Sequence, residues 1–216
     1  MKSKVIKTIE KEKIIVIVRG VAKEKLIPLC NAMYQGGIRL LELTFDANKK
    51  VSDTETAENI KMLVDNFSDK MFIGAGTVME ENQVELTKKA GGSFIISPNT
   101  DEAIIKKTVE MGMVSMPGAL TPSEIKLAYN YGADFVKLFP AENFGPGYVK
   151  AVKAPLSNIK LTAVGGINEE NMESYIKAGV SGFGIGTNIV DKCLIENNEY
   201  DKITELAKKY VKVIKK

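Results

Sequence analysis

Short apolar runs recur along the chain at intervals of roughly 20–30 residues, and each is followed by a segment with the period of an amphipathic helix. The apolar runs predict eight strands, at residues 14–19, 40–45, 72–77, 94–98, 114–117, 135–140, 160–165 and 182–187. The intervening segments predict helices, for example at residues 53–67, 80–90, 101–111, 122–131 and 169–178. Thr121 followed by Pro122 is typical of a helix start, and Gly132 stands just past a predicted helix end.

Eight strand–helix units in succession predict an α/β fold of the (β/α)8 TIM-barrel type, in which a closed parallel barrel is ringed by helices. Residues before Lys13 are expected to form a helix that caps the N-terminal end of the barrel. An open doubly wound sheet is the alternative, but it usually carries a glycine-rich turn after its first strand. Here Arg19-Gly20 ends that strand, with no GxGxxG. Because the units are compact, we expect residues 1–216 to form one domain.

Alternation along the strands places polar side chains on otherwise apolar faces. Side chains of a strand point alternately to its two faces. Four predicted strands carry such a polar residue, in the middle or toward the C-terminal end: Arg19, Glu42, Thr77 and Lys137. For the third strand, this interpretation puts Ile73 and Ala75 on the same inward face as Thr77. If these faces line the lumen, the four side chains converge where TIM barrels carry their catalytic residues.

Lys137 stands in the middle of a run that reads as a buried strand. Burial of an unpaired ammonium is costly, and a lowered pKa that leaves a neutral, nucleophilic amine is the usual outcome. Lys137 is therefore a candidate for Schiff-base chemistry. Plainer interpretations stay open: Lys137 extends its amine to solvent, or it forms a structural ion pair with Glu42. Arg19 could equally be a surface arginine, and Thr77 a β-branched packing residue.

Glycine-bearing strand ends occur on the last two predicted strands. Gly165 and Gly166 end the seventh strand and lead into a predicted helix, and Gly186-Thr187 ends the eighth. TIM barrels often bind phosphate with these two loops, because glycine lets backbone amides approach the anion. The alternative is close packing that excludes side chains. Residues 142–148 are rich in turn residues, so we expect an irregular rim above Lys137.

Composition narrows the chemistry. The chain has no histidine, which excludes Ser-His and Cys-His nucleophile pairs and HExxH zinc sites. Cys30 and Cys193 follow no metal-ligand or redox spacing, so we expect buried, reduced thiols in a cytoplasmic protein and no metal site. The net charge of +3 comes mainly from residues 208–216, which fits the solvated face of a last helix better than a nucleic-acid surface. We expect no signal peptide, membrane span or nucleic-acid partner.

The motifs taken together resemble the class I pyruvate aldolases of the 2-keto-3-deoxy-6-phosphogluconate (KDPG) and 4-hydroxy-2-oxoglutarate (KHG) aldolase family. They occur in order over most of the chain: VRG at 18–20, LELT at 41–44, GAGTV at 74–78, ISPN at 96–99, MPG at 116–118, VKLFP at 136–140 and VGG at 164–166. The resemblance implies a homotrimer of TIM barrels that needs no cofactor.

The resemblance also implies roles for individual residues. Lys137 would be the Schiff-base lysine and Glu42 the general acid–base. Arg19 would bind the substrate carboxylate. Other residues implied to line the substrate are Thr44, Thr77, Pro98 and Phe139, and those implied to bind phosphate are Gly165, Gly166, Gly186 and Thr187.

The implied reaction is the cleavage of KDPG to pyruvate and glyceraldehyde 3-phosphate, with cleavage of KHG to pyruvate and glyoxylate as a second activity. Three features depart from the family pattern, and one of them is that residues 143–146 and 163–166 are similar to the 6-phosphogalactonate-specific branch. Asp46 stands where some members have a substrate-binding arginine, and Val164 where many have threonine. The alternatives are a KDPG-epimer aldolase acting on 2-keto-3-deoxy-6-phosphogalactonate (KDPGal), a non-covalent sugar-phosphate isomerase, or a sugar-phosphate sensor.

Overall fold

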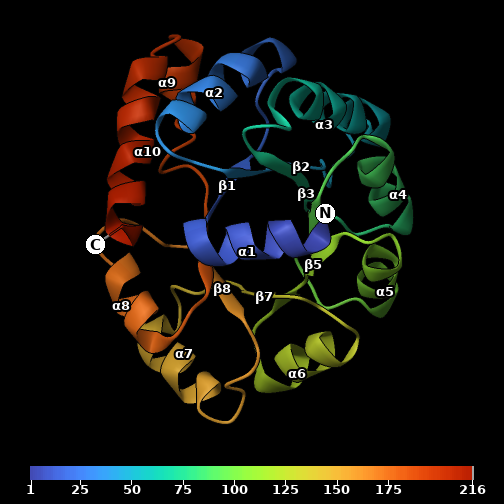
Figure 1. Cartoon of the computed structure of the whole chain (residues 1–216), viewed down its shortest axis with the longest axis vertical. Coiled ribbons are helices and arrows are strands. Elements are labelled where there is room, and N and C mark those ends of the chain that lie inside the picture. The colour runs from blue at the N-terminus through green and yellow to red at the C-terminus, as the bar shows by residue number, and fades with distance from the viewer. Residues whose placement is uncertain (216) are drawn as a thin grey trace.

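The computed structural model describes residues 1–215, which form one ring of parallel strands surrounded by helices (Figure 1). The strands are β1 (Ile14–Val18), β2 (Leu40–Thr44), β3 (Phe72–Gly76), β4 (Phe94–Ile96), β5 (Val114–Met116), β6 (Gly118–Ala119), β7 (Val136–Leu138), β8 (Leu161–Val164) and β9 (Gly182–Ile185). The helices are α1 (Lys2–Glu12), α2 (Lys23–Gln35), α3 (Asp53–Phe67), α4 (Glu81–Lys89), α5 (Glu102–Glu110), α6 (Pro122–Asn130), α7 (Gly145–Lys153), α8 (Met172–Ala178), α9 (Lys192–Glu196) and α10 (Tyr200–Ile214).

The strand order closes the sheet into a barrel. The order is β5-β4-β3-β2-β1-β9-β8-β7-β6, so β5 and β6 stand at its two ends. Only Pro117 separates these two strands in the chain, and together they occupy the place of the fifth predicted strand. β5 pairs with β4 while β6 pairs with β7, and the sheet thereby returns on itself. The predicted (β/α)8 barrel is confirmed, and the open doubly wound sheet is wrong.

Helix α1 covers one mouth of the barrel, as predicted for the residues before Lys13. In Figure 1 it lies across the centre of the ring, in front of the strands. Its apolar residues Val5 and Ile9 are fully buried against lumen residues that include Ile15, Phe94 and Phe135. Ion pairs fix its polar side: Lys2 with Asp134 at 2.9 Å and Glu10 with Lys160 at 2.7 Å. The N-terminal end of the lumen is thus sealed with hydrocarbon.

The helix boundaries follow local signals in the sequence. Thr121 accepts a hydrogen bond from the Glu124 amide, and the Glu124 carboxylate accepts one from the Thr121 amide, so α6 begins with a complete capping box. Gly179 ends α8 at a positive φ of 101°. α8 begins at Met172, three residues after the predicted start. Each of the other four predicted helices is found within one residue of its expected bounds.

The expectation of an irregular segment at residues 142–148 is partly wrong. The turn residues extend only to Phe144, and α7 begins at Gly145 with Pro146 in its first turn. Proline is well tolerated there because the first amides of a helix have no intrahelical acceptor. The glycines and proline of this segment therefore start a helix instead of preventing one.

The inward face of β3 is the opposite of the predicted one. Ile73 and Ala75 pack in the outer core, between the strands and the helices. Gly74 and Gly76 point inward, since a Cβ on Gly74 would lie 2.4 Å from the Phe94 ring. Alternation alone could not distinguish the two faces, because a small apolar side chain and a glycine both fit a lumen.

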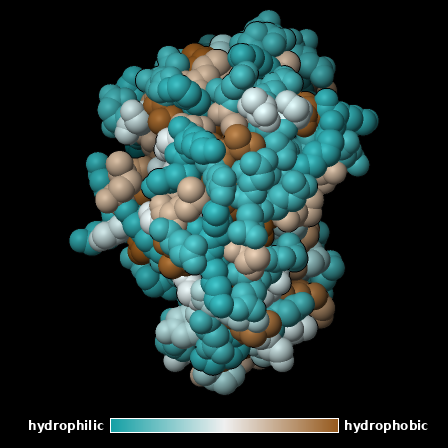
Figure 2. Space-filling view, turned by 90° about the vertical axis from the view of Figure 1, so that its right-hand side faces the viewer, coloured by the Kyte–Doolittle hydropathy of each residue, from teal (hydrophilic) through white to brown (hydrophobic). Residues whose placement is uncertain are grey.

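The outer surface carries the polar faces of the helices. With the right-hand side of Figure 1 toward the viewer, Figure 2 shows a mostly hydrophilic surface with scattered apolar residues. The C-terminal lysines up to Lys215 belong to α10 and its end, as predicted, while Lys216 lies outside the described residues. Across residues 1–215 no helix combines the length and apolar character that crossing a membrane requires.

Candidate active site

The two central candidates meet inside the barrel. Glu42 is the middle residue of β2, and Lys137 is the middle residue of β7. Both side chains line one small cavity, together with Ile17, Thr162 and Val164 among others. This cavity lies above the apolar layer that α1 seals, toward the C-terminal ends of the strands. The predicted convergence of these two side chains is therefore observed.

Lys137 is buried, with 8% of its surface exposed. Burial lowers the pKa of its amine, Arg19 lowers it further, and only the charge of Glu42 opposes this shift. The amine lies 4.8 Å from the centre of the Phe139 ring, which itself is 42% exposed. The interpretation that Lys137 extends its amine into solvent is wrong. Lys137 has instead the desolvated surroundings that favour a nucleophilic amine.

Glu42 is even more deeply buried, at 2% exposure. Burial raises the pKa of its carboxyl from 4.5 to about 7, although the positive charges of Lys137 and Arg19 oppose the shift. The carboxyl occupies space that Gly76 leaves free, since a Cβ there would lie 2.4 Å from Oε1. Among residues 1–215 Glu42 forms no direct ion pair with Lys137. A carboxyl with a pKa near neutral can both donate and accept a proton.

Arg19 and Thr77 are joined by a hydrogen bond of 3.1 Å from the guanidinium to the threonine Oγ1. Arg19 follows β1 and is exposed, so its guanidinium remains accessible to a ligand. Thr77 follows β3 in the left-handed region, at a φ of 56°. This conformation is rare for a β-branched residue. The backbone therefore leaves the strand conformation at Thr77. Thr77 contacts Arg19 from this turn, and not because it continues the inward face that alternation predicted.

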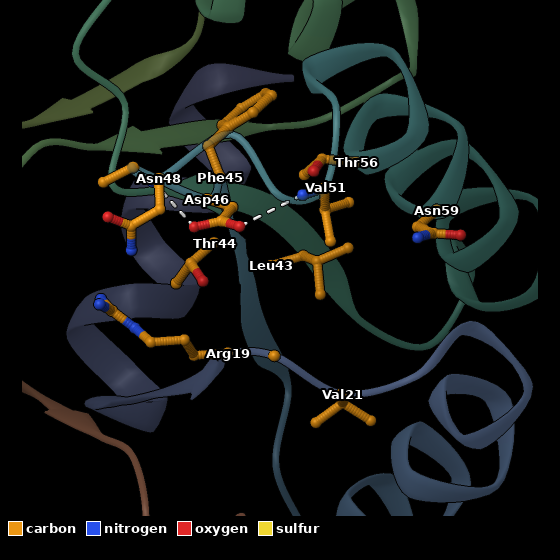
Figure 3. A pocket seen from close by; sticks show the side chains of 12 residues that line it. Arg19, Val21, Leu43, Thr44, Phe45, Asp46, Asn48, Val51, Thr56 and Asn59 are labelled. Atoms are coloured by element: carbon orange, nitrogen blue, oxygen red, sulfur yellow. Dashed lines mark hydrogen bonds between the residues drawn. The ribbon is translucent and has the colours of Figure 1, made fainter.

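Arg19 and Thr44 also line an open pocket of about 250 Å³ beside the barrel mouth. Figure 3 shows the Arg19 guanidinium, Thr44, Asp46 and Asn48 on the same side of this pocket. A guanidinium next to a threonine hydroxyl suits recognition of a carboxylate. The pocket is continuous at Arg19 with the contact to Thr77, so three of the predicted substrate-binding residues lie together.

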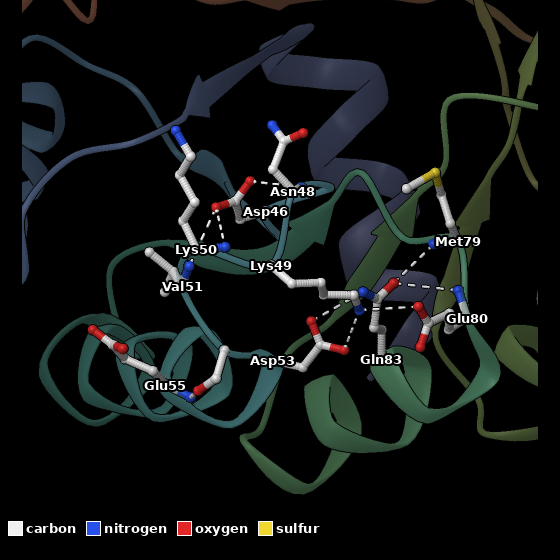
Figure 4. A network of polar contacts seen from close by, with 11 residues as sticks. Asp46, Asn48, Lys49, Lys50, Val51, Asp53, Glu55, Met79, Glu80 and Gln83 are labelled. Atoms are coloured by element: carbon white, nitrogen blue, oxygen red, sulfur yellow. Dashed lines mark hydrogen bonds and ion pairs between the residues drawn. The ribbon is translucent and has the colours of Figure 1, made fainter.

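Asp46 is engaged in holding its own loop. Its carboxylate accepts hydrogen bonds from the backbone amides of Asn48, Lys50 and Val51, at 2.9, 3.0 and 3.2 Å (Figures 3 and 4). These bonds, that of Asn48 first, lower the pKa of the Asp46 carboxyl. The residue is therefore a loop cap in this chain, and its substitution would change the loop as well as its charge.

A second group of contacts ties the same loop to α4 (Figure 4). Lys49 pairs with Asp53 at 2.8 Å and with Glu80 at 2.9 Å. Gln83 is almost fully buried, and its side-chain oxygen accepts from the Met79 and Glu80 amides. The rim on this side of the pocket is thus held from two neighbouring strand–helix connections.

The four predicted phosphate ligands lie at the C-terminal ends of β8 and β9. Gly165 and Gly166 have positive φ values of 97° and 66°, and Gly186 and Thr187 follow β9 directly. The Glu142 carboxylate lies against Gly166, where a Cβ would be only 2.1 Å from Oε2. Gly166 is therefore required by close approach as well as by its φ. An exposed acidic side chain stands beside this predicted anion site.

Pro98 follows β4 and is half-buried. Its carbonyl oxygen approaches Gly118, where a Cβ would lie 2.2 Å away. It is not among the residues that line the cavity around Lys137, whereas Ile96 of the same strand is. Thr162 was missed in the sequence, although it faces the lumen next to Lys137 in the register of β7 and β8. Thr162 stands two residues before Val164, so strand alternation places both side chains on the same face. This spacing could have identified Thr162 from the sequence.

Comparisons with known proteins decide the family. The KDPG and KHG aldolase family matches residues 5–206. The chain belongs to the KDPG/KHG aldolase family. The family's activity makes it an aldolase, hence a lyase that breaks a carbon–carbon bond.

Three relatives illustrate the range of this aldolase family. The 2-dehydro-3-deoxy-6-phosphogalactonate aldolase of Escherichia coli K12 is 34% identical over 82% of this chain and 83% of that protein. The KHG/KDPG aldolase of the same organism is 33% identical over 87% and 85%. The KDPG aldolase of Legionella pneumophila, solved with pyruvate captured as a covalent carbinolamine, superposes with a TM-score of 0.84 at 28% identity over 94% and 96%.

Proposed function

We propose that this aldolase cleaves a 2-keto-3-deoxy-6-phospho sugar acid through a Schiff base on Lys137. The observation that carries the proposal is the burial of the Lys137 amine in the same cavity as the Glu42 carboxyl. The carbinolamine trapped in the Legionella relative supports a covalent route for this chain.

The first stage is condensation of the amine with the ketone. The neutral Nζ of Lys137 attacks C2 of the substrate, and a carbinolamine forms. Glu42 in its protonated form supplies the proton with which the C2 hydroxyl leaves as water. The product is a protonated imine, which accepts electrons in the next stage.

The second stage breaks the C3–C4 bond. Glu42, now a carboxylate, removes the proton of the C4 hydroxyl, directly or through a water. The bond electrons move into the imine, an aldehyde is released and an enamine stays on Lys137. Protonation at C3 and hydrolysis then release pyruvate and restore the amine. A carboxyl with a pKa of about 7 suits both of its roles.

The remaining residues hold the two ends of the substrate. Arg19, with Thr77 and Thr44 beside it, binds the carboxylate at the end next to C2. Phe139, over the amine, and Pro98 provide apolar walls for the pyruvyl group. Backbone amides at Gly165, Gly166 and the Gly186-Thr187 turn bind the phosphate.

KDPG is the proposed main substrate, with KHG as a shorter second one. KDPGal is the second candidate, because a phosphogalactonate aldolase is as similar to this chain as a phosphogluconate one. In addition, Val164 leaves no hydroxyl where many family members have threonine, and its methyl groups pack against Gly184. Values of kcat/KM for the two C4 epimers, measured on the wild type and on Val164→Thr, identify the preferred substrate.

Two further properties belong to this proposal. A homotrimer is expected from the family resemblance, and its solution mass by light scattering tests it. A cytoplasmic location fits the free thiols of Cys30 and Cys193. Cys30 is buried as expected, whereas Cys193 is exposed, contrary to the expectation from the sequence.

The decisive experiment traps the imine. The protein is incubated with pyruvate and borohydride, and the modified residue is mapped by mass spectrometry. Reduction places a pyruvate-derived adduct on Lys137 and eliminates activity. A folded protein that acquires no adduct would favour the rival functions, a sugar-phosphate isomerase with Glu42 as base or a sugar-phosphate sensor.

A further inference from the structure

Two buried polar atoms in the active-site cavity have no hydrogen-bond partner among residues 1–215. They are Oε2 of Glu42 and Oγ1 of Thr162. Both residues line the cavity that contains Lys137, and Thr162 is 1% exposed. An unpartnered buried polar group costs stability, so two of them facing one cavity indicate a shared partner.

Thr162 differs in this respect from other buried threonines of the chain. The hydroxyls of Thr87, Thr108 and Thr204 donate to backbone carbonyl oxygens at 2.7, 2.7 and 3.0 Å. Thr162 lies in a strand, where its backbone groups serve β7 and β9, and its side chain faces the lumen beside Lys137. A valine would fill the same space without the cost of an unsatisfied hydroxyl.

The cavity has room for one small partner. Its volume is about 10 Å³. A water molecule needs at least about 10–15 Å³ together with polar partners, so this mostly apolar cavity is at the lower limit and holds at most one. A water there would find two polar anchors in addition to the Lys137 amine, whereas the apolar layer below offers none.

We infer that Thr162 is a positioning residue, which together with Glu42 Oε2 holds one water molecule beneath the Lys137 amine. The water accepts a hydrogen bond from the Thr162 hydroxyl and donates one to the Glu42 carboxylate. This inference rests on the proposed function, because it assigns the water the task of keeping the Glu42 carboxylate available as the base.

The water acts on a carboxyl with few other polar neighbours. The charged groups that face Glu42 are Lys137 from β7 and Arg19 from the end of β1. The adjoining strand β3 contributes Gly76, which has no side chain. A hydrogen bond to the carboxylate favours its ionised form, so loss of the water makes proton release from Glu42 harder.

The test compares Thr162→Val with Thr162→Ser. We expect Thr162→Val to lower kcat about tenfold with KM unchanged, and to move the acidic limb of the kcat/KM profile upward by about one pH unit. Thr162→Ser keeps the hydroxyl and should stay within about twofold of the wild type, with the wild-type limb. Thr204→Val is the matched control, since it removes a buried hydroxyl far from the lumen and should leave the pH profile unchanged.

The opposite outcomes are equally clear. A Thr162→Val enzyme with the wild-type pH profile would overturn the inference, all the more if its melting temperature rises, because removal of a hydroxyl without a partner stabilises a core. A Thr162→Ser enzyme that behaves like the valine variant would also overturn it, since packing would then explain the effect. Borohydride trapping on the wild type tests the Schiff base separately, so the failure of one proposal is distinguishable from the failure of the other.

Discussion

The lumen of the barrel has two halves with opposite chemistry. The half toward α1 is filled by apolar side chains, among them Ile9, Ile15, Leu40 and Phe135. The other half carries Glu42, Lys137 and Thr162 around a small cavity. The change occurs within one step of the strand alternation, since Leu40 precedes Glu42 by two residues and Phe135 precedes Lys137 by two.

The difference between the halves explains how a lysine can be reactive at neutral pH. The lower half keeps bulk solvent away from the amine, and desolvation is the first cause of its lowered pKa. The same desolvation raises the pKa of Glu42, so both groups shift toward their neutral forms. The apolar half therefore sets the reactivity of the polar half, although none of its residues touches a reacting atom.

Removal of the amine should have the largest effect. We expect Lys137→Met to reduce turnover below detection, because no other residue can form the imine. The lowered pKa means that the wild type loses stability as the pH falls below the ordinary lysine value of 10.5, while methionine does not. Melting temperatures at pH 7 should therefore be higher for the variant, and residual turnover with an intact fold would contradict the assignment.

Neutralisation of the acid–base group should come next. Glu42→Gln is expected to lower kcat by about 10²–10⁴-fold, the usual contribution of general acid–base catalysis. Steady-state assays of substrate cleavage measure this, with circular dichroism to verify the fold. Full activity in the variant would show that Glu42 is not the general acid–base.

The same variant reports on stability. The pKa of Glu42 is raised in the folded chain, so its stabilising contribution is complete below pH 4.5 and is lost as the pH rises through about 7. The wild type should therefore lose about 2 kcal/mol relative to Glu42→Gln between pH 5 and pH 8. Urea unfolding at the two pH values measures the difference, and equal losses in both proteins would place the carboxyl in a hydrated site.

A cavity in the apolar half tests whether the two halves are coupled. Phe135→Ala should cost about 3–5 kcal/mol in unfolding free energy. It should also let additional water reach the Lys137 amine from the α1 side, raise the pKa of the amine and slow pyruvate trapping at neutral pH. Phe67→Ala removes an equally buried ring from the outer core and serves as the control, with a similar stability cost and unchanged trapping. Equal trapping rates in both variants would show that packing in the apolar half does not affect the reactivity of Lys137.

The smallest expected effect concerns the rim. Glu142→Gln removes a negative charge that lies against Gly166, so we expect KM to fall about threefold for KDPG and not at all for the unphosphorylated KHG. Steady-state kinetics on the two substrates give the comparison. An equal change in KM for both substrates would show that the phosphate does not bind near Gly166.

The sequence predicted those features that depend on local patterns. The polar residues on otherwise apolar strand faces predicted that Glu42 and Lys137 converge in the lumen. The apolar run around Lys137 predicted its burial. Alternation failed at β3, because Ile73 and Ala75 fit the outer core as well as a lumen. The role of Asp46 was also out of reach, since it depends on three backbone amides that only the folded loop presents.

Thr162 shows a different limit. Its residue type and its place in a strand are ordinary. Thr162 stands out only because its buried hydroxyl has no hydrogen-bond partner among residues 1–215. Such a deficit is visible only when every neighbour has been placed. The expected roles of the site residues, from Lys137 and Glu42 to Pro98 and the phosphate-binding loops, stay predictions, because they require a bound substrate.

The two inward glycines of β3 restrict how this enzyme can be altered. A side chain at position 74 would collide with the Phe94 ring, and one at position 76 with the Glu42 carboxyl. A saturation library at these two positions would return mostly unfolded or inactive proteins. Laboratory evolution toward new aldehydes therefore has to begin from the loops at the barrel mouth, where substitution of residues such as Asn48 and Glu142 leaves the interior of the barrel unchanged.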